Sequence, residues 1–580
     1  MAIRSVGACT VAVSLAAATL AGSAAAQPAA ATAPARTTMT ADALPTWQTN
    51  GVVWAVAQSG GVVFAGGTFS AVRPPGAAAG SAERPAVNFV ALDAATGAPT
   101  ACKLSFTVGT GLATVRALAV SPDHKTLYAG GRFSAVSGVP ASSLAAVDIA
   151  TCKPRAAFAA PVNATVRALA ATADALYLGG DFTTVAGQAR HSFASVATAS
   201  GALRPWRADA DESGRAVEVT PDGRDVILGG DFASVAGADS RALAVVDGTT
   251  GALVRKYPKG FLAGNVRVKD ITADATGFYT AMENYALPPG RHTEPGEPTA
   301  YDGRMAFDLT TFKERWRDTC FGATQGVTVY QGALYSASHA HDCQGLDGFS
   351  ERNDRQHLLA QPLRAPAPFA AWFPDTNDGI GEGIGPRVLA VAPAKGTDYL
   401  WVGGEFTSVN GTPQQGLTRF ANTPDTGAPS VPKVTATSTV PGKVEVQWQA
   451  ALDLDDSELT YRVYRDGATT PVRTLTGSSV LWRRPQLTFT DTDVKPGTSY
   501  TYRVTAGDGT YTSALSAPVT ITATTTRQPP TGGGVPPTTT TPDGKHPKGK
   551  PGKKDKPGKK DKPRKKGGGP GWDAIGTKRG

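Results

Sequence analysis

The chain has 580 residues, of which 41% are hydrophobic and 18% are charged, a balance typical of globular proteins with a large core rather than of disordered chains. Glycine (66 residues) and proline (43 residues) are abundant, which predicts many turns and few long helices. The length predicts two or three domains.

The first 26 residues have the features of a secretory signal. Arg4 provides a positive start, an apolar stretch follows over 6–21, and Ala24-Ala25-Ala26 is typical of a cleavage site. The apolar stretch is too short to span a membrane, and we find no later apolar segment of sufficient length. We therefore expect a secreted, extracellular protein with no integral membrane segment.

Cleavage of the signal would leave four cysteines, an even number that suits an oxidising compartment. Four cysteines allow three pairings, and no C-x-x-C spacing suggests a metal site. We favour Cys102–Cys152, because these residues follow equivalent strands of neighbouring repeats, and Cys320–Cys343, because these are close in sequence.

A motif with a glycine pair followed by phenylalanine recurs along the chain, for example in LYLGGDFTTVAGQA at 176–189. Two further units, at 278–280 and 334–336, keep the strand before the motif but lose the glycines. The spacing between units is near 50 residues, which indicates a β-propeller or a solenoid. The anchor positions are Gly66, Gly130, Gly179, Gly229, Ala281, Ala337 and Gly403.

Each unit contains four short segments with the alternation of β-strands, the content of one propeller blade. We therefore predict an all-β protein whose residues 43–421 form a seven-bladed β-propeller. The seventh unit lacks a fourth strand, and ALPTWQTN at 43–50 resembles the fourth strand ALRPWRAD at 202–209. The N-terminal strand is expected to complete the last blade, which removes exposed sheet edges.

The glycine pair has two interpretations. It can form a backbone nest for anions, or it can permit close approach of backbone because glycine lacks Cβ. No helix is predicted after the glycines, as a phosphate loop would need. We favour the structural interpretation and expect function where the motif is broken. The GG-x-F-x-x-V-x-G units resemble the bacterial delta-60-type repeats of secreted actinobacterial propeller proteins, and this resemblance implies the fold and export more than an activity.

Units five and six carry long insertions, at 278–304 and 334–357, between their second and third strands. Loops on a rigid scaffold commonly carry binding sites. The insertions contain four of the seven histidines together with charged residues. The candidate ligand-binding residues are Glu283, His292, His339, His341, Asp342, Arg352, Arg355 and His357.

Three interpretations of the insertions stay open. The first is a zinc or calcium site with ligands His339, His341 and Asp342, since alternate residues of a strand point to the same side. The second is binding of a glycan or another polar ligand. The third is a structural loop whose polar residues satisfy backbone groups. We assign no cofactor and no catalytic residue.

Two acidic segments have some of the oxygen ligands that calcium prefers. DTNDG at 375–379 lacks the closing glutamate of a calcium loop, and a turn is the favoured interpretation. DLDDSE at 453–458 is interpreted as an acidic surface loop.

A linker is predicted at 422–431, and the following segment, 432–523, resembles a fibronectin type III domain. Trp448 lies in the alternating segment KVEVQWQA, as the buried tryptophan of that family does. Tyr500 in KPGTSYTYRVTA matches the tyrosine corner of such β-sandwiches.

Residues 524–580 have the composition of a disordered tail, first rich in proline, threonine and glycine and then in lysine. Residues 541–580 hold twelve lysines, two arginines and four aspartates, a net charge of +10, so the rest of the chain sums to −1 of the total of +9. A basic tail favours polyanions such as anionic wall polymers or acidic glycans. Few aromatic residues accompany the lysines, so nucleic acid is not the expected partner.

These features favour a secreted, non-catalytic binding or scaffold protein. The propeller face would bind a glycan or an extracellular protein, and the tail would hold the molecule near an anionic cell envelope. The alternative is a secreted hydrolase or lyase acting on extracellular polysaccharide, with its site on the insertions of units five and six.

Overall fold

The computed structural model describes residues 39–284, 301–318, 320–350 and 355–527. Within these ranges the protein is built from β-strands, and the one helical segment is the single 3-10 turn η1 (Gln344–Leu346). The predicted signal at 1–26 and the basic tail fall outside the described residues, as do the candidate ligand-binding residues His292 and Arg352.

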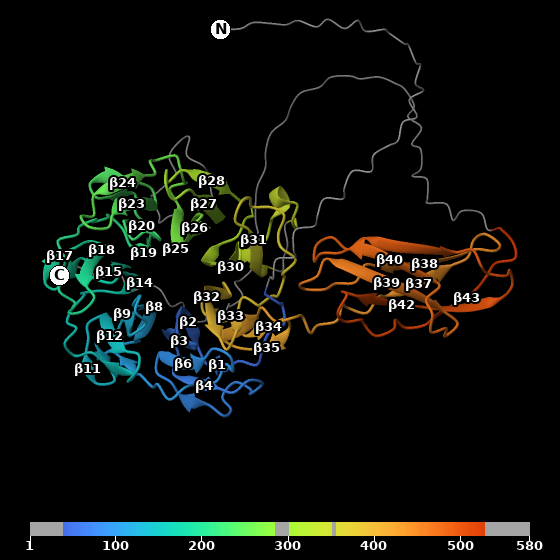
Figure 1. Ribbon diagram of the computed structural model, residues 1–580, viewed down its shortest axis with the longest axis horizontal. Helices are drawn as coiled ribbons and strands as arrows, with labels where there is room; N and C mark the ends of the chain where they lie inside the picture. The colour runs from blue at the N-terminus through green and yellow to red at the C-terminus, as the bar shows by residue number, and fades with distance from the viewer. Residues whose placement is uncertain (1–38, 285–300, 319, 351–354, 528–580) are drawn as a thin grey trace, which may run out of the picture. The chain divides into compact units, whose positions relative to one another are not determined.

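Residues up to 421 form a ring of seven antiparallel sheets, or blades, in the described part of the chain (Figure 1). Each blade has its strands in sequence order outward from the centre of the ring, so the predicted seven-bladed propeller is confirmed. The strands of the blades are, in chain order, β2 (Val52–Ser59), β3 (Val62–Thr68) and β6 (Phe89–Asp93); β8 (Thr114–Val120), β9 (Thr126–Arg132), β12 (Leu144–Asp148) and β13 (Lys153–Pro154); β14 (Val166–Ala171), β15 (Ala175–Gly180) and β18 (Phe193–Ala197); β19 (Gly214–Val219), β20 (Asp225–Gly230), β23 (Leu243–Asp247) and β24 (Leu253–Lys256); β25 (Val266–Asp274), β26 (Gly277–Asn284), β27 (Gly303–Phe307) and β28 (Glu314–Arg317); β29 (Thr324–Tyr330), β30 (Ala333–Ala340) and β31 (Gln356–Pro362); β32 (Pro386–Ala394), β33 (Thr397–Gly404) and β36 (Leu417–Ala421).

The length of the outermost strand of a blade depends on the position of proline in its segment. Blades 4 and 5 have four-residue outer strands, and their segments contain no proline. In blade 1 the outer segment makes only an isolated bridge from Pro99 to Leu92, and in blade 3 only one from Leu203 to Val196, close to Pro205. Proline lacks the N–H that a ladder needs, so these outer strands stay short.

The ring closes where the start of the described chain meets its last blade. The N–H of Thr40 donates to the carbonyl of Ala421 at 2.8 Å, and the N–H of Leu44 donates to that of Arg419 at 3.0 Å. The N-terminal segment therefore lies along β36, as expected, but it does so over 40–44 rather than 43–50. Pro45 has no N–H to extend this pairing, and β1 (Gln48–Thr49) pairs instead with β4 (Ala71–Arg73).

The glycine pairs are needed for packing, which supports the structural interpretation. A Cβ on the first glycine would lie 2.6 Å from Val166 Cγ1 of the next blade at Gly130, and 2.7 Å from Val53 Cγ1 at Gly403. A Cβ on the second glycine, Gly131, would overlap the carbonyl oxygen of Thr114 in the first strand of the same blade. Each pair thus lets two backbones and the next blade come together.

The remainder of the motif makes a small hairpin outside the blade. In blade 3 the phenylalanine Phe182 is fully buried, and β16 (Thr184–Val185) pairs with β17 (Gln188–Ala189). Between them Ala186 and Gly187 both have positive φ, 49° and 75°, as the two-residue turns that suit hairpin twist require.

Two disulfides are present, and both are the predicted pairs. Cys102–Cys152 joins the outer segments of blades 1 and 2, and Cys320–Cys343 ties the insertion of blade 6 to the segment before β29.

The segment after the propeller is a two-sheet sandwich. One sheet has the order β37-β38-β41, and the other has β40-β39-β42-β43. Trp448 and Tyr461 are fully buried in its core. The Oη of Tyr500 accepts the N–H of Lys495 at 2.8 Å, the backbone contact of a tyrosine corner. The strands are β37 (Val434–Thr437), β38 (Val444–Gln449), β39 (Glu458–Arg465), β40 (Arg473–Ser478), β41 (Gln486–Asp491), β42 (Ser499–Gly507) and β43 (Val519–Thr522).

Among the described residues, no helix combines the length and the apolar character needed to cross a lipid bilayer.

Candidate functional site

The first strand of every blade contains a β-bulge at the same place. In each case one residue is skipped in the pairing with the second strand, for example Arg167 between Val166 and Ala168. A bulge re-aims its side chain and is common beside functional sites. All seven bulged side chains line one cavity of about 240 Å³ on the ring axis, called here the channel mouth. They are Trp54, Arg116, Arg167, Arg215, Lys269, Gln325 and Arg387.

A second set of residues supports this bulge ring. Each blade contributes one residue to this set. It is the residue directly after the glycine pair or, in blades 5 and 6, directly after the two residues that replace the pair. In blades 3, 4, 5 and 7 this residue is a carboxylate bound to the bulged cation of its own blade. The distances are 2.7 Å for Arg167–Asp181, 2.5 Å for Arg215–Asp231, 3.0 Å for Lys269–Glu283 and 2.9 Å for Arg387–Glu405. The members of this support ring are Thr68, Arg132, Asp181, Asp231, Glu283, His339 and Glu405.

Blade 5 has the densest charge in the channel mouth. Burial alone would raise the pKa of Glu283, but the ammonium of Lys269, the amide of Gln325 and the guanidinium of Arg267 outweigh it and lower that pKa to about 2. Burial lowers the pKa of Lys269 to about 8 although Glu283 opposes the change. Both groups are therefore charged at pH 7, and the pair is held by electrostatic attraction in a poorly hydrated place.

Blades 1 and 2 differ from this pattern, because their support-ring residues are Thr68 and Arg132 rather than carboxylates. Trp54 Nε1 donates to Thr68 Oγ1 at 3.0 Å, which fixes the indole. The guanidinium of Arg116 lies 3.8 Å from the centre of the Trp54 ring, close enough for a cation–π interaction. In this sector of the channel mouth the indole of Trp54 and the guanidinium of Arg116 thus hold each other in place.

Deeper in the channel, in a cavity of about 360 Å³, lie the carboxyl groups of Glu218 and Asp270. Burial, and then the negative charge of Asp270, raise the pKa of Glu218 to about 8. Burial also raises the pKa of Asp270 to about 7, against the hydrogen bond that its Oδ2 accepts from the N–H of Val327 at 3.0 Å. These acids hold protons to a higher pH than free carboxyls do.

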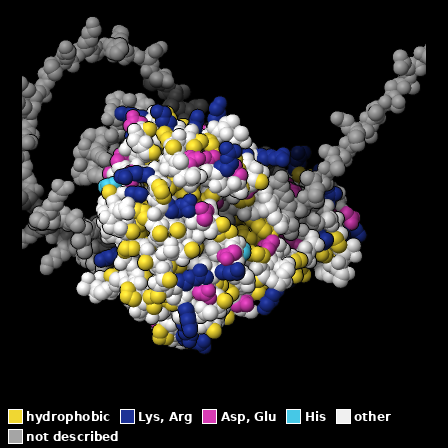
Figure 2. Space-filling view, turned by 60° about the vertical axis from the view of Figure 1, so that its left-hand side comes forward, with side chains coloured by type: hydrophobic (Ala, Val, Ile, Leu, Met, Phe, Trp, Pro, Cys, Tyr) yellow, Lys and Arg dark blue, Asp and Glu magenta, His cyan; other side chains and the backbone are white. Residues whose placement is uncertain are grey.

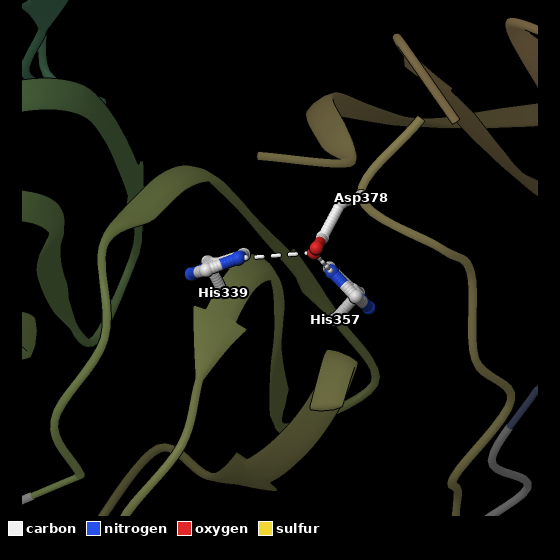
Figure 3. A group of neighbouring side chains, drawn as sticks. All are labelled: His339, His357 and Asp378. Carbon is white, nitrogen blue, oxygen red and sulfur yellow. Dashed lines mark hydrogen bonds and ion pairs between the residues drawn. The ribbon is translucent and has the colours of Figure 1, made fainter. Parts of the chain in front are cut away.

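Blade 6 places a histidine at the support-ring position, and this residue belongs to a cluster (Figure 3). Oδ1 of Asp378, from the loop before β32, lies 3.0 Å from Nε2 of His339 in β30 and 3.0 Å from Nε2 of His357 in β31. Nδ1 of His357 lies 3.1 Å from Oδ1 of Asp375. Two imidazoles from neighbouring strands thus point at one carboxylate oxygen.

The two histidines of this cluster differ electrostatically. Burial, the neighbouring His357 and Arg355 lower the pKa of His339, although Asp378 acts in the opposite direction. Burial would also lower the pKa of His357, but its contacts with Asp375 and Asp378 outweigh burial and raise it. His339 is therefore the first of the two to lose its proton as the pH rises.

The structure distributes the sequence-predicted residues over three places. His339 and His357 meet in the histidine cluster, with the charge of Arg355 acting on His339. Glu283 lies in the channel mouth. His341 and Asp342 lie outside the cluster of ligand atoms, so the predicted set His339, His341 and Asp342 is not what the described chain brings together.

The bulged strand β30 and the chain after it explain this difference. The pairing of β30 with β31 shifts between Ala337 and Ala340, so the alternation that would put His339 and His341 on one side does not hold. The backbone of Asp342 instead bridges to Phe321, and its Oδ1 accepts the N–H of Gln344 at 3.1 Å.

Of the two acidic segments, one contributes to the cluster and one does not. Asp375 and Asp378 of the segment 375–379 face His357, a role that its interpretation as a turn missed. In the segment 453–458, Oδ1 of Asp453 accepts the N–H groups of Asp455 and Asp456 at 3.1 and 3.2 Å. In addition, Oδ2 of Asp455 accepts the N–H of Ala41 at 2.6 Å, so these acids satisfy backbone groups both inside and outside their own loop.

The sandwich is similar in sequence to known proteins. Residues 427–522 match the family model of the fibronectin type III domain. This segment is a fibronectin type III domain. Chitinase 63 of Streptomyces plicatus is 38% identical to this chain over 106 residues, in the region of that domain; the match is 18% of this chain and 15% of the chitinase. The chain thus spans less than a sixth of that protein.

Two solved structures resemble the propeller part. The β-propeller domain of Cps50 (Swd1) from Myceliophteria thermophila is 9% identical, with a TM-score of 0.36 over 65% of this chain and 98% of that chain. Sqt1 of Saccharomyces cerevisiae is 9% identical, with a TM-score of 0.39 over 66% of this chain and 99% of that chain. At these scores the propeller assignment rests on the strand pairing and the glycine contacts described above.

Proposed function

We propose that the protein is an extracellular binding protein and that the channel mouth of its propeller binds an anionic group of a polymeric ligand, such as an acidic glycan or a phosphate-bearing wall polymer. The observation that carries this proposal is the bulge ring. Five of its seven side chains are cations, and the β-bulge that is repeated in the first strand of every blade directs them into one cavity. Convergent cations in a cleft with low-dielectric walls attract anions strongly.

The charges of the bulge ring differ in arrangement from those on the molecular surface. On the face seen in Figure 2, Lys and Arg side chains are interspersed with Asp and Glu rather than gathered in one patch. In four blades a support-ring carboxylate holds the bulged cation in place, whereas blades 1 and 2 have Thr68 and Arg132 at that position.

Further features agree with an extracellular binding role. Two disulfides suit an oxidising compartment. The fibronectin type III segment resembles part of a chitinase by sequence, which is consistent with association with carbohydrate. The repeat units resemble delta-60-type repeats. The basic tail, with its net charge of +10 over 541–580, would add a non-specific attraction to the same anionic surface.

The test compares anionic with neutral polymers. The full chain is titrated calorimetrically with polygalacturonate, with polyglycerol phosphate and with neutral dextran, at low and at physiological salt. We expect binding of at least one anionic polymer, weakened by salt, and no binding of dextran. Arg116→Gln should weaken binding by about tenfold, a loss of about 1.4 kcal/mol.

The matched control is Lys125→Gln. Lys125 is an exposed cation in the turn between the first and second strands, at the other end of the blade from the bulge. This change should leave affinity unaltered. A second control removes residues 528–580. If Arg116→Gln has no effect while removal of the tail abolishes binding, the tail and not the channel mouth is the binding site.

A second candidate function is hydrolysis or elimination on an extracellular polysaccharide. The observation that favours it is the histidine cluster, because imidazoles beside a carboxylate can act as general acid and base. Incubation of the protein with the polymer that it binds would release shorter fragments, and this release would disappear in His339→Ala. Intact polymer after long incubation with the wild type would argue against the enzyme.

A further inference from the structure

We propose that His339, His357 and Asp378 form a binding site for a first-row transition-metal dication, with zinc as the expected ion. The three ligand atoms, two Nε2 and one Oδ1, lie within 4.8 Å of one another. They come from three separate segments, β30, β31 and the loop before β32, which the propeller brings together (Figure 3). Imidazole nitrogen and carboxylate oxygen are both common zinc ligands.

The spacing of the ligand atoms fits such an ion. Bond lengths of about 2.0–2.1 Å in a tetrahedral zinc site place neighbouring ligand atoms about 3.3 Å apart. Oδ1 of Asp378 lies 3.0 Å from each Nε2. Both oxygen–nitrogen distances are therefore within a few tenths of an ångström of those in a zinc site, and the two Nε2 atoms lie within 4.8 Å of each other.

The surroundings of His357 hold its Nε2 in place. Its Nδ1 faces Oδ1 of Asp375 at 3.1 Å, and its backbone N–H donates to the same oxygen at 2.9 Å. A carboxylate on the second ring nitrogen is the usual support of a metal-ligating histidine. Gly385 packs against the other edge of the ring, where a Cβ would lie 2.7 Å from Cδ2 of His357. The ligand is thus fixed before any ion arrives.

The site is open on one side. The side chain of His357 is only 3% exposed, whereas that of His339 is 20% and that of Asp378 is 56% exposed. A site with three protein ligands and an accessible fourth position is typical of zinc that binds water or a ligand oxygen. His339 also occupies the support-ring position that carries a carboxylate in blades 3, 4, 5 and 7. Blade 6 therefore differs from its neighbours in having a nitrogen ligand there.

The experiment uses the full chain, freed of metal with a chelator, and titrates it with Co²⁺ and with Zn²⁺. We expect one equivalent of Co²⁺ to produce the visible absorption of a nitrogen- and oxygen-ligated ion, and Zn²⁺ to displace it and raise the melting temperature. His339→Gln and Asp378→Asn should each weaken binding by about 100-fold. Because both side chains are partly exposed, these variants are expected to fold, and circular dichroism checks this.

The matched control is His341→Gln, which removes a histidine two residues away in the same segment but outside the cluster. Its affinity for Co²⁺ should equal that of the wild type. The proposal is overturned if the wild type binds no Co²⁺ or Zn²⁺, in which case Asp378 merely accepts two hydrogen bonds. It is equally overturned if binding survives in both His339→Gln and Asp378→Asn. Neither result bears on polymer binding by Arg116, so the two proposals fail separately.

Discussion

Gly403 in the last blade and Val53 in the first blade meet at the closure of the ring. A Cβ on Gly403 would lie 2.7 Å from Cγ1 of Val53. In the colours of Figure 1, this is where the blue strand β2 lies beside β32 and β33 at the orange end of the propeller. The same contact joins consecutive blades at Gly66, Gly130 and Gly229, each with a valine of the next blade.

Because of this contact, we expect one methyl group added at position 403 to lower the free energy of unfolding. Gly403→Ala should destabilise the propeller by about 1–3 kcal/mol, because overpacking forces neighbouring groups apart. Val53→Ala removes the opposing methyl groups, so the double variant should be less unstable than the sum of the two single variants. Urea unfolding of all three, with Gly109→Ala as a control, measures the coupling. Gly109→Ala is a suitable control because a Cβ at Gly109 would meet nothing within 4 Å. The prediction would be contradicted if the losses in stability of Gly403→Ala and Val53→Ala simply added in the double variant.

The buried ion pair between Arg304 of β27 and Asp318, which directly follows β28, lies in blade 5, and Arg304 also contacts blade 6, so breaking the pair should strongly lower the stability of the fold. Nε of Arg304 donates to Oδ2 of Asp318 at 2.5 Å, and its Nη1 donates to the hydroxyls of Ser336 and Ser338. The side chains of Arg304 and Asp318 are 1% and 0% exposed. Asp318→Ala would leave a buried guanidinium unpaired and should cost about 3–5 kcal/mol.

Replacing both partners tests the physical reason for that cost. Arg304→Met with Asp318→Leu removes both charges and should recover most of the lost stability. Lys125→Ala, which breaks an exposed pair with Asp123, should change stability by less than about 1 kcal/mol. A double variant as unstable as Asp318→Ala would show that packing, and not the unpaired charge, is what matters here.

The disulfide between blades 1 and 2 should contribute strongly to stability. Cys102 and Cys152 are 50 residues apart, and closing a loop of that size in the unfolded chain corresponds to roughly 4 kcal/mol in the loop-entropy model. The variant with both cysteines changed to serine should unfold at a correspondingly lower urea concentration. The wild type after reduction of both disulfides serves as the comparison. A loss well below 1 kcal/mol in the serine variant would contradict the expected role of this bond.

The sequence was informative about the scaffold for a physical reason. A repeated packing constraint, such as a glycine opposite a valine of the next blade, must be written in every unit, so alignment on the glycine pair predicts seven blades. Cysteine parity and the positions of Trp448 and Tyr500 are similarly local signals. The predicted fourth strands are longer than the observed ones in blades 1 and 3, because Pro99 and Pro205 interrupt the outer ladder.

The channel mouth was harder to predict from the sequence, because it depends on the register in which the first and second strands of each blade pair. The bulge ring comes from one extra residue in each first strand, which an alternating pattern does not display. In the aligned units the sequence does show arginine at this position four times, at Arg116, Arg167, Arg215 and Arg387. The partner of the histidines, Asp378, lies outside both insertions and is brought to them only by the folded loop before β32.

The acids inside the channel predict how stability changes with pH. The pKa of Glu218 is raised by burial to about 8 in the folded protein, against an ordinary value of about 4.3 in an unfolded chain. The folded state therefore binds this proton more tightly than the unfolded state does. The stability associated with the protonated acid is fully present below pH ~4.3 and is lost as the pH rises toward ~8.

Glu218→Gln removes this dependence, because the amide stays neutral. The variant should match the wild type near pH ~4.3 and exceed its stability by about 2 kcal/mol near pH ~8.5, less than the full shift implies because the side chain is partly exposed. Urea unfolding at both pH values measures the difference, with Glu83→Gln, an exposed acid, as the control. If Glu218→Gln and the wild type lose stability in parallel over this range, then Glu218 is ionised in the folded protein. The channel would in that case be hydrated enough to hold a free carboxylate, which would place a negative charge below the cationic mouth and weaken the attraction proposed there.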